Sequence, residues 1–128
     1  MGALTLEQLS FLKAHEVCRL ATASKDATPH VVPLIYALDG EDIVLVTDYG
    51  TRKLSNLKEN KRVALVVDDY RPNKAVMIQG ECEIIESGKE YLRLLQILFD
   101  RFERYRTNPW GEGESPILKI RPVKVFSW

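Results

Sequence analysis

The chain has 128 residues, of which 45% are hydrophobic and 28% are charged, as in one soluble globular domain. Its 18 basic and 18 acidic side chains cancel to a formal net charge of zero, which argues against a general affinity for nucleic acid or for an anionic membrane surface. No apolar run approaches the roughly 20 residues of a membrane-spanning helix, and the N-terminal stretch lacks the pattern of a secretory signal. We therefore expect a cytoplasmic protein with a single domain over residues 1–128.

The first expected element is a short helix near the N-terminus. Thr5-Leu6-Glu7-Gln8 has the pattern of a capping box, which predicts that a helix starts there. Leu6, Leu9 and Leu12 recur at helical spacing, so we expect these leucines to face inward.

Two strands joined by a tight turn follow this helix. Residues 17–23 have the composition of a strand, and residues 24–27 that of a turn. The second strand, over residues 28–36, contains Pro29 and Pro33. Because proline has no backbone N–H to donate, we expect this strand to lie at a sheet edge or to carry a bulge.

The middle of the chain is expected to hold a hairpin and two longer strands. Asp39-Gly40 marks a hairpin turn before a strand over residues 42–47. Residues 62–68 are so continuously apolar that we expect both faces of this strand to be covered. Residues 74–85 form a further strand, in which Gly80 predicts a bulge or a kink.

The last part of the chain predicts one long helix and one strand. Ser87 to Glu90 has the pattern of a second capping box, and Thr107-Asn108-Pro109 ends the helix that it opens. Its inward face is expected to hold Leu92, Leu95, Leu98 or Phe99, and Phe102. Residues 117–128 form the final strand. These elements predict a mainly β fold of about six antiparallel strands with about three flanking helices, most simply a small barrel.

The most distinctive segment is Thr47-Asp48-Tyr49-Gly50-Thr51-Arg52-Lys53, a strand end that turns into a helix with two cations in its first turn. A helix N-terminus already carries about half a positive elementary charge, so cations there are unfavourable unless an anion binds. Free backbone N–H groups, the Thr51 hydroxyl, Arg52 and Lys53 together indicate a phosphate site. The alternative is a solvated basic turn, paired with Asp48 or Glu59.

Other chemistries have little support in the sequence. His15 and His30 have no carboxylate or cysteine partner at metal-ligand spacing, so no metal site is expected. The hydrolase motif G-x-S-x-G, the P-loop and G-x-G-x-x-G are absent. Cys18 and Cys82 do not form a C-x-x-C pair, and we expect two reduced cysteines inside strands, with a disulfide or a reactive thiol as the alternative.

Three segments of the chain carry a family resemblance, and together they span nearly all of it. They are Arg19–Thr22 with Pro29–Pro33; Val46–Lys53 with Asn56-Leu57, Asn60 and Arg62–Val66; and Val76–Glu83 with Ile120–Val125. In these segments the chain resembles the pyridoxamine 5'-phosphate oxidase-like family of FMN-binding split β-barrels. The resemblance implies a single FMN-binding split-barrel domain and a homodimer with flavins in clefts between the subunits.

The resemblance also implies a set of cofactor-binding residues. Arg52 and Lys53 would hold the FMN phosphate, with Thr51 assisting, while Val46 and Thr47 would lie along the ribityl chain and ring edge. The strand that lines the isoalloxazine would be formed by His30, Val31, Val32 and Pro33. From the second subunit, Trp110, Trp128 and the loop 112–115 are expected to close the site. For Trp128 itself, packing in the core or in a subunit interface is favoured over contact with a planar ligand.

The implied function is that of a pyridoxamine 5'-phosphate oxidase-related, FMN-dependent oxidoreductase that passes electrons between a nicotinamide-type donor and an unknown small molecule. Vitamin B6 oxidation is not expected, because Ala75 replaces a glutamine of those oxidases and their C-terminal substrate signature is missing. One alternative is a reductase that uses the deazaflavin coenzyme F420, whose longer tail needs cations such as Lys58, Lys61 or Lys74. Another is a non-catalytic flavin- or haem-binding protein. No catalytic residue is assigned.

Overall fold

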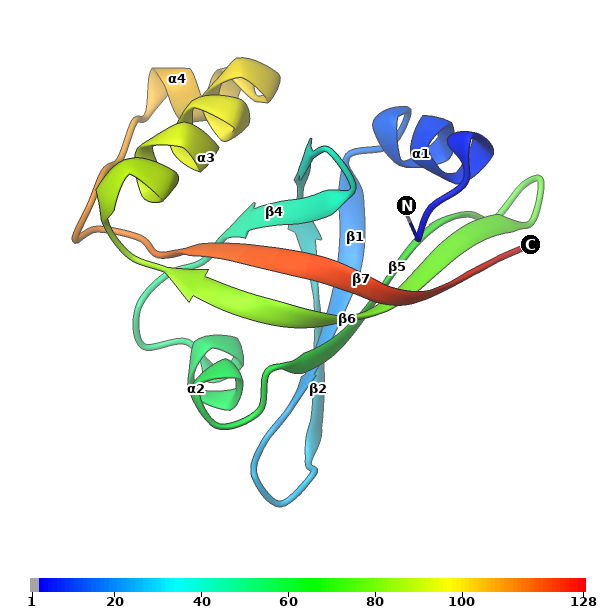
Figure 1. Ribbon diagram of the computed structural model, residues 1–128, viewed down its shortest axis with the longest axis horizontal. Helices are drawn as coiled ribbons and strands as arrows, with labels where there is room; N and C mark the ends of the chain where they lie inside the picture. Colours follow the sequence, from blue (N-terminus) through cyan, green and yellow to red (C-terminus); the bar gives the residue numbers. More distant parts are fainter. Residues whose placement is uncertain (1–2) are drawn as a thin grey trace.

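A computed structural model describes residues 3–128, which form seven strands and four helices (Figure 1). The strands are β1 (Val17–Ala23), β2 (Pro29–Ile35), β3 (Ala37–Asp39), β4 (Asp42–Val46), β5 (Arg62–Asp69), β6 (Lys74–Ile85) and β7 (Ile117–Ser127). The helices are α1 (Leu6–Lys13), α2 (Arg52–Glu59), α3 (Gly88–Arg101) and α4 (Glu103–Thr107). Residues 1 and 2, which begin the stretch that lacks a secretory signal, lie outside the described residues.

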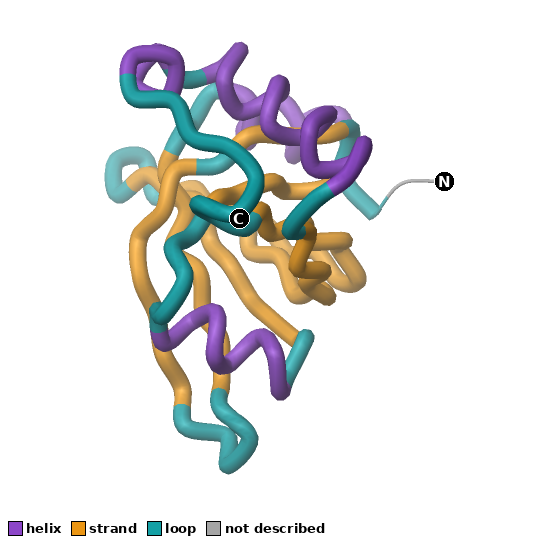
Figure 2. Tube along the Cα trace, turned by 90° about the vertical axis from the view of Figure 1, so that its left-hand side faces the viewer, coloured by secondary structure: helices purple, strands orange, loops and turns teal. Residues whose placement is uncertain are grey.

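All strands belong to one antiparallel sheet with the order β2-β1-β5-β6-β7-β4-β3. The sheet curls around an apolar interior into an open barrel whose two edges are β2 and β3 (Figures 1 and 2). The mainly β, split-barrel fold predicted from the sequence is therefore confirmed. Among residues 3–128, no helix has the length and apolar character needed to cross a membrane.

The seventh strand arises at Tyr36, where the chain passes from one edge of the sheet to the other. Residues before it pair with β1, and Ala37 just after it pairs with Val44 of β4. Tyr36 is fully buried, and its hydroxyl donates a 2.7 Å hydrogen bond to the carbonyl oxygen of Leu12 in α1. This buried anchor separates β3 from β2, a break that the sequence pattern did not indicate.

The expected long helix is likewise divided. Phe102 adopts an extended backbone with φ −118° and ψ 113°, and its side chain is buried between α3 and α4. A second core lies under these helices, and it includes Tyr91, Leu94 and Leu98 of α3. Burial of Phe102 therefore redirects the chain before it reaches Pro109.

Several local expectations are confirmed. The Thr5 capping box is present, with reciprocal hydrogen bonds between Thr5 and Gln8 of 3.1 and 2.9 Å. The proline-bearing strand β2 lies at a sheet edge. The β6–β7 register shifts between Gln79 and Gly80, which identifies the expected bulge. Both cysteines are free and buried.

Other local expectations are wrong. Leu6 is 87% exposed because Leu4, just before α1, fills the adjoining core position instead. Leu92 is 53% exposed because α3 buries Tyr91, Leu94 and Leu98 instead. The Ser87 side chain makes no capping hydrogen bond among the described residues.

Within the single chain, β5 is fully covered on one face only, and coverage of its other face stays a prediction. Val63, Leu65 and Val67 point into the core and are buried. Ala64 and Val66 on the opposite face are only half-buried. The outer face of β5 thus keeps an apolar surface that the sequence assigned to the interior.

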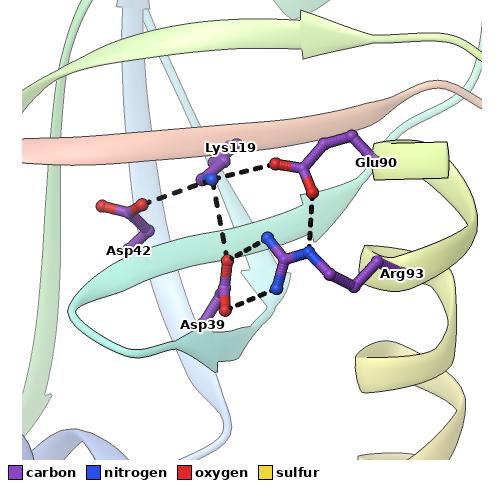
Figure 3. A network of polar contacts seen from close by, with 5 residues as sticks. All are labelled: Asp39, Asp42, Glu90, Arg93 and Lys119. Carbon is purple, nitrogen blue, oxygen red and sulfur yellow. Dashed lines mark hydrogen bonds and ion pairs between the residues drawn. The ribbon is translucent and has the colours of Figure 1, made fainter. Parts of the chain in front are cut away.

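A charged network fixes α3 on the sheet (Figure 3). The Lys119 ammonium of β7 lies 3.2 Å from Glu90, 3.5 Å from Asp42 and 3.6 Å from Asp39. Arg93 of α3 donates to both carboxylate oxygens of Asp39 at 2.9 and 2.7 Å and to Glu90 at 2.7 Å. Hydrogen bonds from Arg93 hold the pKa of both Asp39 and Glu90 below their usual values. The network joins the start of α3 to β3, β4 and β7.

Candidate functional site

The candidate site is built around the turn that leads from β4 into α2. Thr47 is buried at the end of β4, and Gly50 has a φ of +82°, a conformation that residues with a Cβ rarely adopt. The Thr51 hydroxyl donates to the Asp48 carbonyl oxygen at 3.0 Å and lies 3.3 Å from the Thr47 hydroxyl. Since Thr51 does not cap the helix with its side chain, the first N–H groups of α2 have no side-chain acceptor among residues 3–128.

The start of α2 has an unbalanced positive charge. Its first turn contains Arg52 and Lys53 and no acidic residue. Within the described part of the chain neither cation forms an ion pair, so pairing with Asp48 or Glu59 is not observed. The start of α2 therefore combines two cations with the positive end of the helix dipole and with uncapped N–H groups.

Two hollows flank this helix start. The first, of about 760 Å³, is lined by Arg52, Asn56 and Glu59 of α2, by His30, and by the β1–β2 turn. The second, of about 360 Å³, is lined on the other side by Lys53, by Val46 and Thr47, and by residues after α3 that include Trp110. Arg52 and Lys53 thus line different hollows.

Strand β2 gives the first hollow a wall with an open backbone edge. His30 and Val32 face the interior and are half-buried, whereas Val31, 62% exposed, and Pro33 face outward. Among residues 3–128 the His30 Nδ1 atom is buried and has no hydrogen-bond partner. Such an orphaned polar atom is costly unless a ligand or water satisfies it.

The backbone direction of β2 follows from one hydrogen bond at its end. Tyr36 N–H donates to the Glu16 carbonyl oxygen at 3.0 Å, on the β1 side of the ladder. Because backbone groups alternate along a strand, the even-numbered residues of β2 face β1 and the odd-numbered ones face the open edge. Val31 therefore presents its N–H and C=O at that edge, between two prolines that have no N–H.

Trp110 stands in an aromatic cluster at the second hollow. Its ring lies edge-to-face against Tyr105, at 4.5 Å between centroids, and against Phe99, at 4.9 Å. The cluster is connected through α3 to the charged network described above. Trp110 thus lines the second hollow together with Lys53 and Thr47 of its own chain, and a role at the site of a second copy stays a prediction.

Lys74 and Trp128 lie elsewhere in this chain. Lys74 is exposed at the start of β6 and lines a separate groove between α1 and the ends of β6 and β7, together with Trp128. Trp128 is 60% exposed, so it does not pack in the core of its own chain, and packing against a partner subunit stays a prediction. A role for either residue at the site of a second copy stays a prediction.

Sequence reasoning gave no functional role to Thr22 and Asn56. Both side chains are 3% exposed, and Asn56 Nδ2 donates to Thr22 Oγ1 at 3.0 Å. A signal was present, because Asn56 stands beside Leu57 on the side of α2 that the leucine spacing turns inward. No three His, Cys, Asp or Glu side chains of residues 3–128 form a cluster able to hold a metal.

These residues suit a flavin with a phosphate. The helix start offers charge and N–H groups to the phosphate, and β2 offers an open edge and an unpartnered imidazole nitrogen to a ring with polar rims. An antiparallel sheet curled into an open barrel, with a short helix beside its free edge, is the architecture of the split β-barrel proteins. The model of the family Pyridoxamine 5'-phosphate oxidase matches residues 4–128, and the chain belongs to this family.

Three known proteins illustrate its similarities. The chain is 34% identical, over 97% of its length and 82% of the relative's, to a 5a,11a-dehydrotetracycline/5a,11a-dehydrooxytetracycline reductase from Streptomyces rimosus. It is 25% identical to an FAD-binding protein of known structure from Mesorhizobium loti, with a TM-score of 0.79 over 97% of this chain and 93% of that one. It is 28% identical to an F420 reductase of known structure, with a TM-score of 0.69 over 91% and 94% of the two chains.

Proposed function

We propose that the protein is a flavoprotein oxidoreductase that binds FMN by its phosphate at the start of α2. The observation that carries this proposal is that Arg52 and Lys53 form no ion pair among residues 3–128, in a first helical turn without an acidic residue or a side-chain cap. Membership of the pyridoxamine 5'-phosphate oxidase family and similarity to a reductase and to an FAD-binding protein support flavin chemistry.

In this proposal Arg52, Lys53 and Thr51 hold the phosphate, and Thr47 with Val46 contacts the ribityl chain. The open backbone edge at Val31 and the side chain of His30 orient the ring system, with Val32 and Pro33 completing the strand. The bound flavin would supply hydride and electron transfer between a nicotinamide-type donor and a small molecule. The chain itself positions that group and excludes water around it.

We further propose a homodimer with a flavin between the subunits. The half-buried Ala64 and Val66 and the exposed Val123 and Phe126 leave apolar surface on the sheet that a second copy would cover. In such an assembly Lys74 and Trp128 of one copy are candidates to approach the flavin of the other.

The test is cofactor binding by matched charge variants. FMN is titrated into apoprotein of the natural sequence, of Arg52→Ala/Lys53→Ala, and of the control Lys58→Ala/Lys61→Ala, which removes the same charge at the other end of α2. A lost charge-assisted hydrogen bond costs about 1.5–3 kcal/mol, or about tenfold to a hundredfold in affinity, and the site variant, which removes two cations, should lose at least that much. Unchanged affinity in the site variant, or equal losses in both, would contradict the proposal.

A second candidate is an F420-dependent reductase, which the similarity to an F420 reductase along 91% of this chain favours. Parallel titration with FMN and F420 separates the two, because the physiological cofactor should bind more tightly. A Soret band in the purified protein would instead indicate haem. Anaerobic reduction of the bound flavin by NADH or NADPH would support an enzyme, and its failure with both donors would favour a carrier.

A further inference from the structure

A buried polar contact joins α2 to β1. Asn56 Nδ2 donates to Thr22 Oγ1 at 3.0 Å, and both residues are 3% exposed. Leu54 and Leu57 make the remaining buried surface of α2. Apolar contacts have little directional preference, whereas a hydrogen bond fixes distance and angle. Among the buried contacts of α2, this bond is the one that constrains direction as well as distance.

The two partners lie next to the two halves of the candidate site. Arg52 and Asn56 are four residues apart in α2 and so project from the same side of the helix, where both line the 760 Å³ hollow. Thr22 is directly opposite His30 in the β1–β2 ladder, and both side chains are on the interior face. The Asn56–Thr22 hydrogen bond thus joins a neighbour of Arg52 on α2 to the strand position opposite His30.

We propose that Asn56 and Thr22 are positioning residues that hold the phosphate-binding cation Arg52 at the correct distance from the ring-binding strand at His30. This inference rests on the proposed function. With eight residues, α2 is too short to be stable alone, so its placement depends on its packing contacts. Thr22 does not line the 760 Å³ hollow, so its effect on FMN binding would act through Asn56.

The test separates positioning from stability by use of isosteric substitutions. Thr22→Val and Asn56→Leu each leave a buried polar group without its partner, and each should lower the free energy of unfolding. The double variant Thr22→Val/Asn56→Leu removes both polar groups and should regain much of that stability. Its dissociation constant for FMN should nevertheless remain about tenfold or more above that of the natural sequence, because the leucine no longer aligns α2 with Thr22.

Two controls accompany this test. Ile120→Val removes one buried methylene from β7, so it should lower stability without a change in FMN affinity. Thr22→Ser keeps the hydroxyl and should bind FMN nearly as the natural sequence does, whereas Thr22→Val should not. If the double variant does not fold, judged by circular dichroism, this serine–valine comparison carries the test.

The outcomes distinguish the two proposals. If the natural sequence binds FMN, Arg52→Ala/Lys53→Ala does not, and the double variant binds as the natural sequence does, the positioning role is wrong and the proposed function stands. Equal affinity of Thr22→Ser and Thr22→Val would likewise overturn the positioning role. If the natural sequence binds no FMN, or the charge variant binds it unchanged, the proposed function fails and the positioning role fails with it.

Discussion

Arg52 and Lys53 are consecutive residues of α2, and their side chains line two different hollows on either side of the helix start. A phosphate at that start would be approached from both sides, which restricts its position more than two cations on one side would. In the absence of an anion, however, the same arrangement concentrates positive charge at the positive end of a helix dipole.

This gives a prediction about stability without ligand. Arg52→Ala and Lys53→Ala should each raise the free energy of unfolding of the apoprotein at low ionic strength, by about 0.3–1 kcal/mol, because each removes a repulsion with the helix dipole. Urea unfolding at low and high salt measures this, and the gain should shrink at high salt. Lys58→Ala, in the last turn, should lower stability. Site variants that are less stable than the natural apoprotein would indicate that the cations have protein partners.

A second prediction concerns His15, which joins the end of α1 to the end of β5. Its Nδ1 lies 2.7 Å from the Phe11 carbonyl oxygen and its Nε2 lies 2.9 Å from Asp69 Oδ1. Both partners are acceptors, so only the protonated ring can donate to both. Burial opposes the charge, but these hydrogen bonds and the nearby Asp68 and Asp69 outweigh it and raise the pKa of His15 above 6.5.

Because the pKa of His15 is higher in the folded than in the unfolded chain, protonation of His15 stabilises the folded state. This contribution is complete at a pH below the unfolded pKa, and it is lost as the pH rises through the folded pKa. The free energy of unfolding of the natural sequence should therefore exceed that of His15→Gln at pH 5.5, and the difference should shrink by pH 8.5. Asp69→Asn should remove most of this pH dependence. A difference that stays constant over this range would mean that His15 is not held in its charged form.

The third prediction concerns Lys119, whose ammonium is shared by three carboxylates (Figure 3). The lowered pKa values of Asp39 and Glu90 add stability above their unfolded values and lose it as the pH falls. Lys119→Met should reduce stability at pH 7, and its deficit should shrink as the pH falls below the usual carboxyl pKa values and disappear only once the lowered pKa values of Asp39 and Glu90 are passed. Lys124→Met, at an exposed lysine of the same strand, is the control. A deficit that persists in acid would point to lost packing.

The fourth prediction tests the bulge between β6 and β7. A Cβ at Gly80 would lie 2.5 Å from the Arg121 carbonyl oxygen, a backbone atom that cannot move aside easily. Gly80→Ala should therefore lower the free energy of unfolding by about 1–3 kcal/mol, measured by urea denaturation. Gly111→Ala, where the nearest atom is 4.0 Å away, should change it by less than about 0.5 kcal/mol. Similar effects at both positions would contradict the close approach.

The sequence predicted the parts of the fold that local chemistry determines. Capping at Thr5, the prolines of β2 and the glycine at the bulge all have direct steric or hydrogen-bonding consequences, and the structure confirms them. It did not predict the break at Tyr36, because that break depends on a hydrogen bond to α1, 24 residues away in the chain. The sequence likewise assigned Leu92 to the buried face of α3, because the leucines of this helix fit helical spacing in more than one way.

The candidate site was predictable to a similar extent. The charges at Arg52 and Lys53 are visible in the sequence, because a helix start with cations and no acid conflicts with simple electrostatics. The Asn56–Thr22 contact was not predicted, since it joins residues 34 positions apart and needs the packing of α2 on β1. How a second copy would complete the site depends on assembly, which periodicity within one chain does not encode.

The prolines of β2 have a further consequence for how the protein behaves at high concentration. An exposed edge strand invites strands of other chains to add to it, and such additions lead to aggregation. The open edge of β2 faces outward through Pro29, Val31, Pro33 and Ile35, and two of these four residues have no N–H. A foreign strand would find half of its acceptors unmatched, while a small molecule could still reach Val31. The edge is therefore protected against polymerisation yet open to a ligand.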